Sequence, residues 1–227
     1  MSMLIIGHRG SRGTHPENSI PALREAIAAG ADMVEFDVRL TSDGQLVLYH
    51  DFHLYRTHKS MRIIRQLTLG ELRRRTAGSE LPVVTLSQAL RACAGQILIN
   101  IEVKDRGSGA ATMRLIKQEF PSLLRDIMIS SFSVRELRAV RTISKRIALA
   151  QLLHVNPFAF AAHERSLQLS AVGFHRLHAP RLAIETAHRM DMLTYVYTIN
   201  RPDARRQLEE KGIDAIVTDY PRLFAAD

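Results

Sequence analysis

Short runs rich in Ile, Val and Leu alternate along the chain with longer amphipathic stretches. Runs of about four to eight such residues are typical of buried strands, and apolar residues repeating every three to four positions are typical of helices. Strands are predicted at 3–6, 33–40, 46–49, 97–103, 127–130, 147–153, 171–174, 193–199 and 215–218. Helices are predicted at 19–29, 69–75, 86–94, 110–119, 134–144, 157–166, 181–189 and 203–211. This alternation indicates a parallel sheet, and about eight such units favour a closed (β/α)8 barrel of the TIM type.

The alternation runs through the whole sequence without a linker, low-complexity tract or internal repeat, so residues 1–227 are predicted to form a single α/β domain. The segment between residues 51 and 96 is longer than one βα unit needs, and we expect it to form a small excursion from the barrel. The first helix is expected to have Asn18 as its N-cap, Pro21 in its first turn and Gly30 at its end.

The composition is that of an ordinary globular chain, with 46% hydrophobic and 24% charged residues. A net charge of +8 favours anionic partners such as nucleic acid, acidic lipid or a phosphorylated small molecule. Much of this charge lies between His53 and Arg75, which suits either a solvated face or a positive rim for an anionic substrate. Cys93 is the single cysteine, a strand begins near residue 3, and no apolar run approaches the roughly 18 residues of a membrane span. We therefore expect a cytoplasmic protein with no membrane span.

The second predicted strand carries two carboxylates. Glu35 and Asp37 share one of its faces, and the apolar residues around them share the other. In a barrel the apolar face meets the helices, so the carboxylates point inward, where they repel each other and are desolvated. A hard divalent cation such as Mg²⁺ or Ca²⁺ removes both costs because it takes oxygen ligands. Pairing of the two carboxylates with arginines at a strand end is the alternative.

The fourth predicted strand repeats this logic. Asn100, Glu102 and Lys104 share one face of a strand otherwise built from Ile and Val. Packing does not explain the burial of these three polar residues, so Glu102 is predicted as a third metal ligand and Lys104 as a cation for a phosphate. A Glu102–Lys104 pair facing solvent on an edge strand is the alternative.

Two histidines stand apart from the others. His8 ends the first strand and precedes Arg9, whose planar guanidinium suits phosphate oxygens. Asp43–Gly44 predicts a turn between the second and third strands, and either a hairpin or two parallel strands would bring His50 near the carboxylates. The remaining histidines that we considered are expected to be surface or core residues: His53, His58, His154, His163, His175 and His178.

Together these residues resemble the glycerophosphodiester phosphodiesterase family, whose pattern is HRG, PEN, ExD, TxDG and HD in this order. The corresponding residues here are His8–Gly10, Pro16–Asn18, Glu35–Asp37, Thr41–Gly44 and His50–Asp51. A later Glu-x-Lys element matches Glu102 and Lys104, and a closing Gly-x-Asp…Thr-Asp-x-Pro element matches Gly212, Asp214, Thr218, Asp219 and Pro221. The resemblance covers nearly the whole chain and implies a β/α barrel of the phospholipase-C-like phosphodiesterase type.

The resemblance also implies an activity, which is the metal-dependent hydrolysis of small-molecule glycerophosphodiesters to sn-glycerol 3-phosphate and an alcohol such as choline or ethanolamine. Nucleic acid is not the expected partner, and a monomer and a homodimer both suit the pattern. The family's ligands for Mg²⁺, Ca²⁺ or Mn²⁺ carry over to Glu35, Asp37 and Glu102. Its catalytic histidines carry over to His8 as the base and His50 as the acid, and its phosphate-binding cations carry over to Arg9 and Lys104. Glu17 and Tyr197 are expected to line the pocket.

The chain departs from the family pattern in three places. It has no Trp and places Tyr197 where the family usually has a tryptophan, which predicts an altered substrate preference. His15 precedes the PEN element, where a small residue is common. The basic segment after His50–Asp51, which holds Leu54, Arg56 and Thr57, follows the pattern only in part. Two rival functions are a lysophospholipase D on the same scaffold, for which no exposed apolar stretch marks an acyl-chain groove, and a catalytically silent polyanion-binding protein. A binder of that kind has no use for two histidines and three carboxylates.

Overall fold

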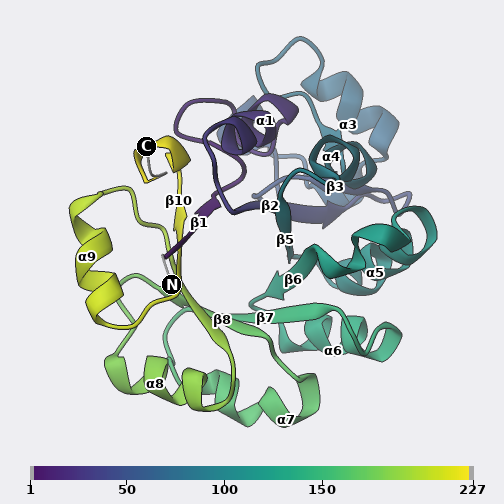
Figure 1. Ribbon diagram of the computed structural model, residues 1–227. Coiled ribbons are helices and arrows are strands. Elements are labelled where there is room, and N and C mark those ends of the chain that lie inside the picture. The colour runs from purple at the N-terminus through teal and green to yellow at the C-terminus, as the bar shows by residue number, and fades with distance from the viewer. Residues whose placement is uncertain (1–2, 225–227) are drawn as a thin grey trace.

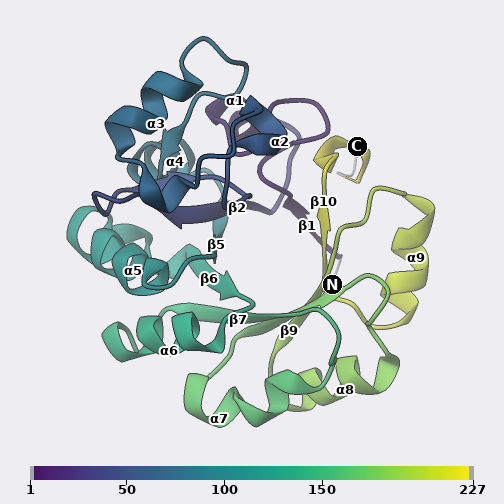
Figure 2. The ribbon, with the colours of Figure 1, turned by 180° about the vertical axis from the view of Figure 1, so that it is seen from behind.

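Eight parallel strands close into a barrel in the computed structural model, which describes residues 3–224 (Figures 1 and 2). The barrel strands are β1 (Leu4–Gly7), β2 (Met33–Leu40), β5 (Leu98–Val103), β6 (Ile127–Ser131), β7 (Ala148–Leu153), β8 (Ala171–His175), β9 (Leu193–Tyr197) and β10 (Ala215–Thr218). The barrel closes because β1 pairs in parallel with both β2 and β10. The predicted TIM-type fold is confirmed.

Helices surround the barrel and connect most of its strands (Figure 1). They are α1 (Ile20–Ala28), α5 (Ser108–Glu119), α6 (Val134–Ile143), α7 (Glu164–Leu167), α8 (Arg181–Arg189) and α9 (Asp203–Glu210). Single 3₁₀ turns lie at Pro121–Arg125, Ala159–Ala162 and Pro221–Leu223. The helix predicted at 157–166 is instead a 3₁₀ turn followed by the one-turn α7, because His163 between them has a φ of −112°.

The N-cap predicted for α1 was wrong by one residue. The side chain of Ser19 accepts a hydrogen bond from the amide of Ala22, and Ser19 is the N-cap. Asn18 has a φ of 56° and binds Asp37 in the barrel instead. A long-range hydrogen bond to a strand therefore took the side chain that the local pattern assigned to helix capping.

The predicted excursion is present and is joined to the barrel by strand pairing with β2. The strand β3 (Leu46–Leu48) runs antiparallel to β2, and the two-residue β4 (Val84–Thr85) runs antiparallel to β3. Of the two arrangements considered for the second and third strands, the hairpin is the one found. The excursion also carries α2 (Tyr55–His58), a 3₁₀ turn (Ile64–Gln66), α3 (Leu69–Thr76) and α4 (Leu86–Cys93). A small hydrophobic cluster of its own, which includes Tyr49, Leu54 and Leu72, holds it together.

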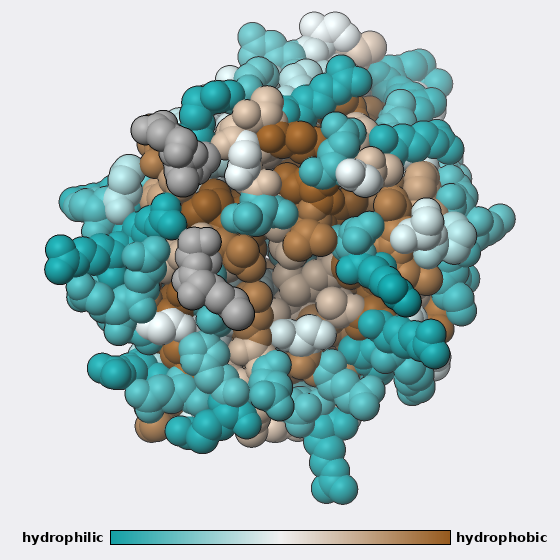
Figure 3. Space-filling model, in the orientation of Figure 1, coloured by the Kyte–Doolittle hydropathy of each residue, from teal (hydrophilic) through white to brown (hydrophobic). Residues whose placement is uncertain are grey.

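The two faces of each barrel strand follow the predicted alternation. Val34, Phe36 and Val38 on β2 point outward and pack in the core between barrel and helices. A separate interior cluster, which includes Ile6 and Tyr195, fills the barrel itself. On the face seen in Figure 1, hydrophobic side chains gather around the middle of the ring and hydrophilic ones cover the helices (Figure 3). No helix within residues 3–224 is long and apolar enough to cross a membrane.

Candidate active site

Three carboxylates meet inside the mouth of the barrel. Glu35, Asp37 and Glu102 each offer an oxygen, and these oxygens lie within 4.8 Å of one another. The β2–β5 register, in which Asp37 is the partner of Glu102, brings them together. Glu35 Oε1 is buried and has no hydrogen-bond partner among the described residues. A bare acceptor facing two other carboxylates fits a divalent cation, so these side chains could hold one.

The turn after β1 is shaped to hold this site. Arg9 has a φ of 51°, and its amide donates to Glu35 Oε2 at 2.9 Å. Gly10 follows with a φ of 84°, and a Cβ there would lie 2.5 Å from the backbone of Ala22, so only glycine fits. The Arg9 side chain then spans two carboxylates, with Nε 3.1 Å from Asp37 Oδ2 and Nη1 2.9 Å from Glu17 Oε2.

Three side chains hold Asp37, whereas Glu35 accepts a hydrogen bond only from the Arg9 amide among the described residues. Arg9 forms an ion pair with Asp37. Asp37 also accepts from Asn18 Nδ2 at 3.0 Å and from Lys104 Nζ at 2.9 Å, and Asn18 Oδ1 accepts from the Asp37 amide. Burial opposes its ionisation, but the charges of Lys104 and Arg9 outweigh burial and hold the pKa of Asp37 well below its usual range. Burial, with the charges of Asp37 and Glu102, raises the pKa of Glu35 well above its usual range.

Lys104 also pairs with Glu102, at 2.7 Å. The Glu102–Lys104 pair named as the alternative is therefore present, but it lies in the pocket and not on an edge strand. Burial, followed by the charge of Asp37, raises the pKa of Glu102 despite this lysine. Pairing with arginine, the alternative considered for the two carboxylates of β2, occurs between Arg9 and Asp37. Glu35 Oε1 has no hydrogen-bond partner among the described residues.

The first histidine is oriented by the last strand of the barrel. His8 Nδ1 lies 2.6 Å from Asp219 Oδ1, and Asn200 Nδ2 donates to the other oxygen of Asp219 at 2.7 Å. Burial lowers the pKa of His8 below its ordinary value, although the hydrogen bond to Asp219 opposes this shift. The contact with Asp219 leaves Nε2 of His8 as the nitrogen without a hydrogen-bond partner among residues 3–224.

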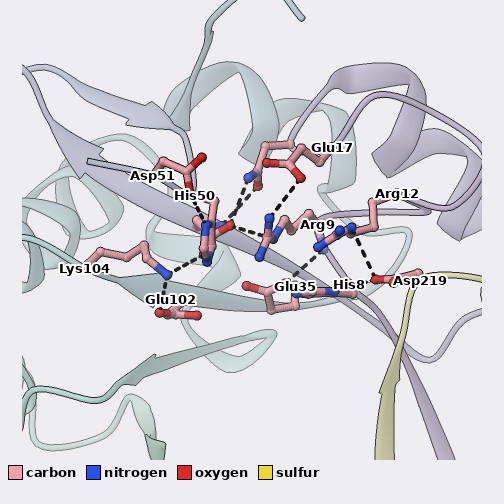
Figure 4. Close-up of polar contacts among 12 residues, drawn as sticks. His8, Arg9, Arg12, Glu17, Glu35, His50, Asp51, Glu102, Lys104 and Asp219 are labelled. Carbon is pink, nitrogen blue, oxygen red and sulfur yellow. Dashed lines mark hydrogen bonds and ion pairs between the residues drawn. The ribbon is translucent and has the colours of Figure 1, made fainter. Parts of the chain in front are cut away.

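The second histidine has a matching carboxylate. His50 Nδ1 lies 2.7 Å from Asp51 Oδ1 (Figure 4). Arg56 Nε donates to Asp51 Oδ2 at 2.6 Å. Arg56 in turn pairs with Glu17, which ties the excursion to the loop after β1. Burial lowers the pKa of His50, and the negative charge of Asp37 opposes this shift. Each histidine thus has Nδ1 on an aspartate.

The backbone at His50 is fixed from β2. Arg39 donates to the carbonyl oxygen of His50 from Nε at 3.0 Å and from Nη2 at 2.8 Å. Its Nη1 pairs with Asp105, which also accepts from the amide of Leu40 at 3.0 Å. His50 is therefore held at the same strand end as the carboxylates, although it belongs to the excursion.

A pocket of about 240 Å³ is lined by these charged groups and also by ring side chains. His8, Arg9, His50 and Lys104 line it beside the carboxylates, and Phe132, His154 and Tyr197 line it from β6, β7 and β9. These strands carry aromatic and imidazole rings where β1, β2 and β5 carry charges.

A sequence profile of the "Glycerophosphoryl diester phosphodiesterase family" matches residues 8–223. The chain belongs to this family.

Relatives with the same architecture span almost all of the chain. It is 28% identical to the "Glycerophosphodiester phosphodiesterase" of Caldanaerobacter subterraneus subsp. tengcongensis, over 99% of this chain and 97% of the relative. The structure of a phosphodiesterase from Oleispira antarctica, solved with "the product sn-glycerol-3-phosphate", matches 97% of this chain and 94% of that one, with a TM-score of 0.88 and 26% identity. A glycerophosphodiester phosphodiesterase from Thermotoga maritima matches with a TM-score of 0.85 and 27% identity, over 99% of this chain and 97% of that one.

Within this glycerophosphoryl diester phosphodiesterase, seven of the nine residues singled out from the sequence line one pocket. They are His8, Arg9, Glu35, His50, Glu102, Lys104 and Tyr197. Asp37 is buried beside them, 2.9 Å from Lys104. The hydroxyl of Tyr197 donates to the carbonyl of Leu153 at 2.7 Å. Glu17 does not line the pocket, because its carboxylate is buried behind Arg9 between two guanidinium groups.

Several residues of the phosphodiesterase site had no role assigned from the sequence. Asp219 and Asp51 were part of the matched motifs and orient the two histidines. Arg56 was seen only as one of many basic residues. His154, expected to be a surface or core residue, is exposed and lines the pocket. No local signal marks His154, because its neighbours in the pocket come from other strands.

Proposed function

We propose that this protein hydrolyses glycerophosphodiesters to sn-glycerol 3-phosphate and an alcohol, with a divalent metal ion on Glu35, Asp37 and Glu102. The observation that supports this most is the meeting of three carboxylates, one with an unpartnered oxygen, with two aspartate-oriented histidines in one pocket. The family of the chain and the product bound by the Oleispira antarctica enzyme point to the same substrate class.

A bound Mg²⁺, Ca²⁺ or Mn²⁺ would act as a Lewis acid that stabilises negative charge on the phosphate. The protein adds two fixed cations to this. Arg9 and Lys104 line the pocket, and each is anchored to Asp37, so their charges are positioned before the substrate arrives. Positive groups that need no reorganisation during the reaction lower the free energy of a transition state in which the phosphorus carries extra negative charge.

The two histidines divide the proton transfers in this proposal. Burial lowers the pKa of His8 below its ordinary value, which suits a neutral imidazole as the base that takes a proton from the attacking oxygen. His50 is more exposed than His8 (35% against 15% of the side chain) and is near the negative charge of Asp37, which supports a proton on His50 as the acid for the leaving alkoxide. Each transfer is worth about 10²–10⁴-fold in rate.

The test is the release of sn-glycerol 3-phosphate from glycerophosphoglycerol and glycerophosphocholine, first with a chelator and then with each metal restored. We expect turnover only with metal and a loss of about 100-fold or more in His50→Ala. His53→Ala, three residues away on the same excursion and outside the pocket lining, is the matched control and should keep wild-type activity. A His50→Ala variant that keeps more than about a tenth of the activity would exclude His50 as the acid.

The same assay separates the rival functions. Lysophosphatidylcholine as substrate tests the lysophospholipase D alternative, which requires faster release of choline from the acylated than from the unacylated diester. A silent polyanion binder would show no turnover with any metal, together with salt-sensitive binding of nucleic acid.

A further inference from the structure

Five ring side chains from four strand ends form one connected group at the mouth of the barrel. We call these residues the rim cluster: Phe132, His154, His175, His178 and Tyr197. Ring centroids are 5.3 Å apart for Phe132 and His154, 5.7 Å for His154 and His175, and 5.8 Å for His175 and His178. Tyr197 joins the cluster at 6.0 Å from Phe132 and 5.9 Å from His175. Three histidines on one rim are more than ring packing requires.

Phe132, His154 and Tyr197 bring the cluster into the pocket, and His175 and His178 adjoin them outside the pocket lining. His154 and Tyr197 line the same pocket as Arg9 and Lys104, but from β7 and β9. If the proposed function places the phosphate and the glycerol hydroxyls at the metal, the alcohol on the other side of the phosphorus must extend over the rim cluster. We propose that the rim cluster is the binding subsite for this alcohol and that it selects hydroxylated headgroups, such as glycerol or inositol, over quaternary ammonium ones. This inference rests on the proposed function.

Hydrogen-bonding capacity is the first reason for this specificity. No hydrogen bond within residues 3–224 uses a ring nitrogen of His154 or His178, and His175 accepts one long contact, from the amide of Leu177 at 3.4 Å. A neutral imidazole offers one donor and one acceptor, which match the hydroxyl groups of a polyol. Such nitrogens add little to the binding of a trimethylammonium group, which has no hydrogen to donate.

A buried hydroxyl below the rim supports the same ligand. Ser130 is fully buried, lines the pocket from β6, and its Oγ has no hydrogen-bond partner among the described residues. It lies on β6 two residues before Phe132, which follows the end of the strand, and it is the β-sheet partner of Glu102. Its hydroxyl therefore lies where the metal side of the pocket meets the rim, and an unpartnered buried polar group is costly unless a ligand satisfies it.

Charge is the second reason. No residue that lines the pocket from β6 to β9 carries a carboxylate, and the carboxylates across the pocket are those assigned to the metal. Arg176, directly after β8, adds a positive charge beside His175 and contributes, after burial and His154, to lowering the pKa of His175. A quaternary ammonium headgroup therefore meets no carboxylate on this side of the pocket.

The aromatic rings do not form a free box for a cation. Phe132 and Tyr197 are perpendicular to each other (88°), and the Tyr197 hydroxyl is tied to the carbonyl of Leu153. Their ring edges and faces are engaged with each other and with His154 and His175. The two rings thus position the imidazoles instead of enclosing a cation.

The experiment compares kcat/KM for glycerophosphoglycerol, glycerophosphoinositol and glycerophosphocholine in the wild type and in two variants of one residue. His154→Phe keeps a ring of similar size and removes the nitrogens, whereas His154→Ala removes both. We expect the wild type to prefer the hydroxylated substrates about tenfold, and both variants to lose about five- to tenfold on them while glycerophosphocholine changes less than about twofold. His53→Phe is the matched control, because His53 also stacks near an exposed Phe (Phe52, 4.4 Å) but does not line the pocket.

Two other patterns of turnover would overturn the inference. A preference for glycerophosphocholine that His154→Phe preserves would mean cation–π recognition, and an equal loss on all three substrates would mean that His154 only positions the site. A wild type without turnover of any substrate would refute the proposed function alone. The subsite would then be decided by the histidine ring signals in NMR, assigned with the variants: glycerophosphoinositol must shift those of His154 and His175 more than glycerophosphocholine does.

Discussion

The two ends of the barrel both contain buried or half-buried carboxylates, but they differ in whether the carboxylate oxygens have hydrogen-bond donors. At the end where the strands begin, Asp214 Oδ2 accepts from the amide and hydroxyl of Thr194 at 2.7 Å each and from His188 Nε2 at 2.9 Å, and Asp32 accepts from the amide of Ile5. At the end where the strands finish, Glu35 Oε1 is buried with no donor. One end satisfies its carboxylates with backbone and side-chain donors, which serves stability. The other leaves capacity for a ligand.

The largest expected effect tests whether Glu35 serves the ligand and not the fold. Glu35→Gln should lower kcat/KM about a thousand-fold, because it removes a charge from the proposed metal site. In the presence of a chelator its free energy of unfolding in urea should stay equal to that of the wild type or rise, since burial already raises the pKa of this carboxyl and a neutral amide removes that cost. A clear loss of stability would mean that Glu35 serves the fold.

Asp37 belongs to the same site as Glu35, but we expect it to contribute to stability as well as to activity. Asp37→Asn should lose activity as well, but it should also lower the free energy of unfolding by about 3 kcal/mol, because Lys104 and Arg9 would remain buried without their shared carboxylate. The measurement is urea unfolding under the conditions used for Glu35→Gln. Equal stabilities of the two variants would contradict the different roles inferred for these neighbours.

Metal addition should stabilise the protein through the same end of the barrel. At a metal concentration 100 times the Kd, we expect about 2.7 kcal/mol of added stability in thermal unfolding, and none in Glu35→Gln. The gain should shrink as the pH falls, because the raised pKa of Glu35 means that protons compete with the metal for this oxygen already at mildly acidic pH. A metal effect that survives in Glu35→Gln would place the ion elsewhere.

The smallest effect belongs to the other end. Asp214→Asn should lower the free energy of unfolding by about 1 kcal/mol, a modest value because the group is more than a third exposed, and leave kcat/KM unchanged. Burial opposes ionisation of Asp214, but the Thr194 and His188 hydrogen bonds outweigh it and lower the pKa. The carboxylate therefore stabilises the fold above its unfolded pKa, and the difference from wild type should vanish as the pH falls through the lowered folded pKa. Reduced activity at neutral pH would break the separation of the two ends.

The sequence was most informative where a strand period decides the geometry. Alternation on β2 and β5 was enough to place three carboxylates and Lys104 on one inner surface, since a period of two leaves no other choice. The Asp-Gly turn did not decide whether the second and third predicted strands form a hairpin or two parallel barrel strands. A turn is specified by local sequence, whereas the pairing of strands is not. The two-residue β4 was missed because so short a run has no period.

Contacts between distant strands were beyond the reach of local pattern. Asp219 orients His8 only because β10 pairs with β1, and the rim cluster exists only because four strand ends converge, most of them carrying one histidine or one aromatic ring. Each of those residues alone is indistinguishable from a surface residue. Asn18 shows the opposite error, since its local preference for capping gave way to the bond with Asp37.

The pairing of β1 with β10 also sets the order of events during synthesis. His8 leaves the ribosome 211 residues before its partner Asp219. A nascent chain can fold the excursion and the carboxylate strands β2 and β5 early, but it cannot orient its first histidine until nearly all of the described chain has emerged. Activity should therefore appear in a single step, once β10 and Asp219 have left the exit tunnel, and not in proportion to chain length.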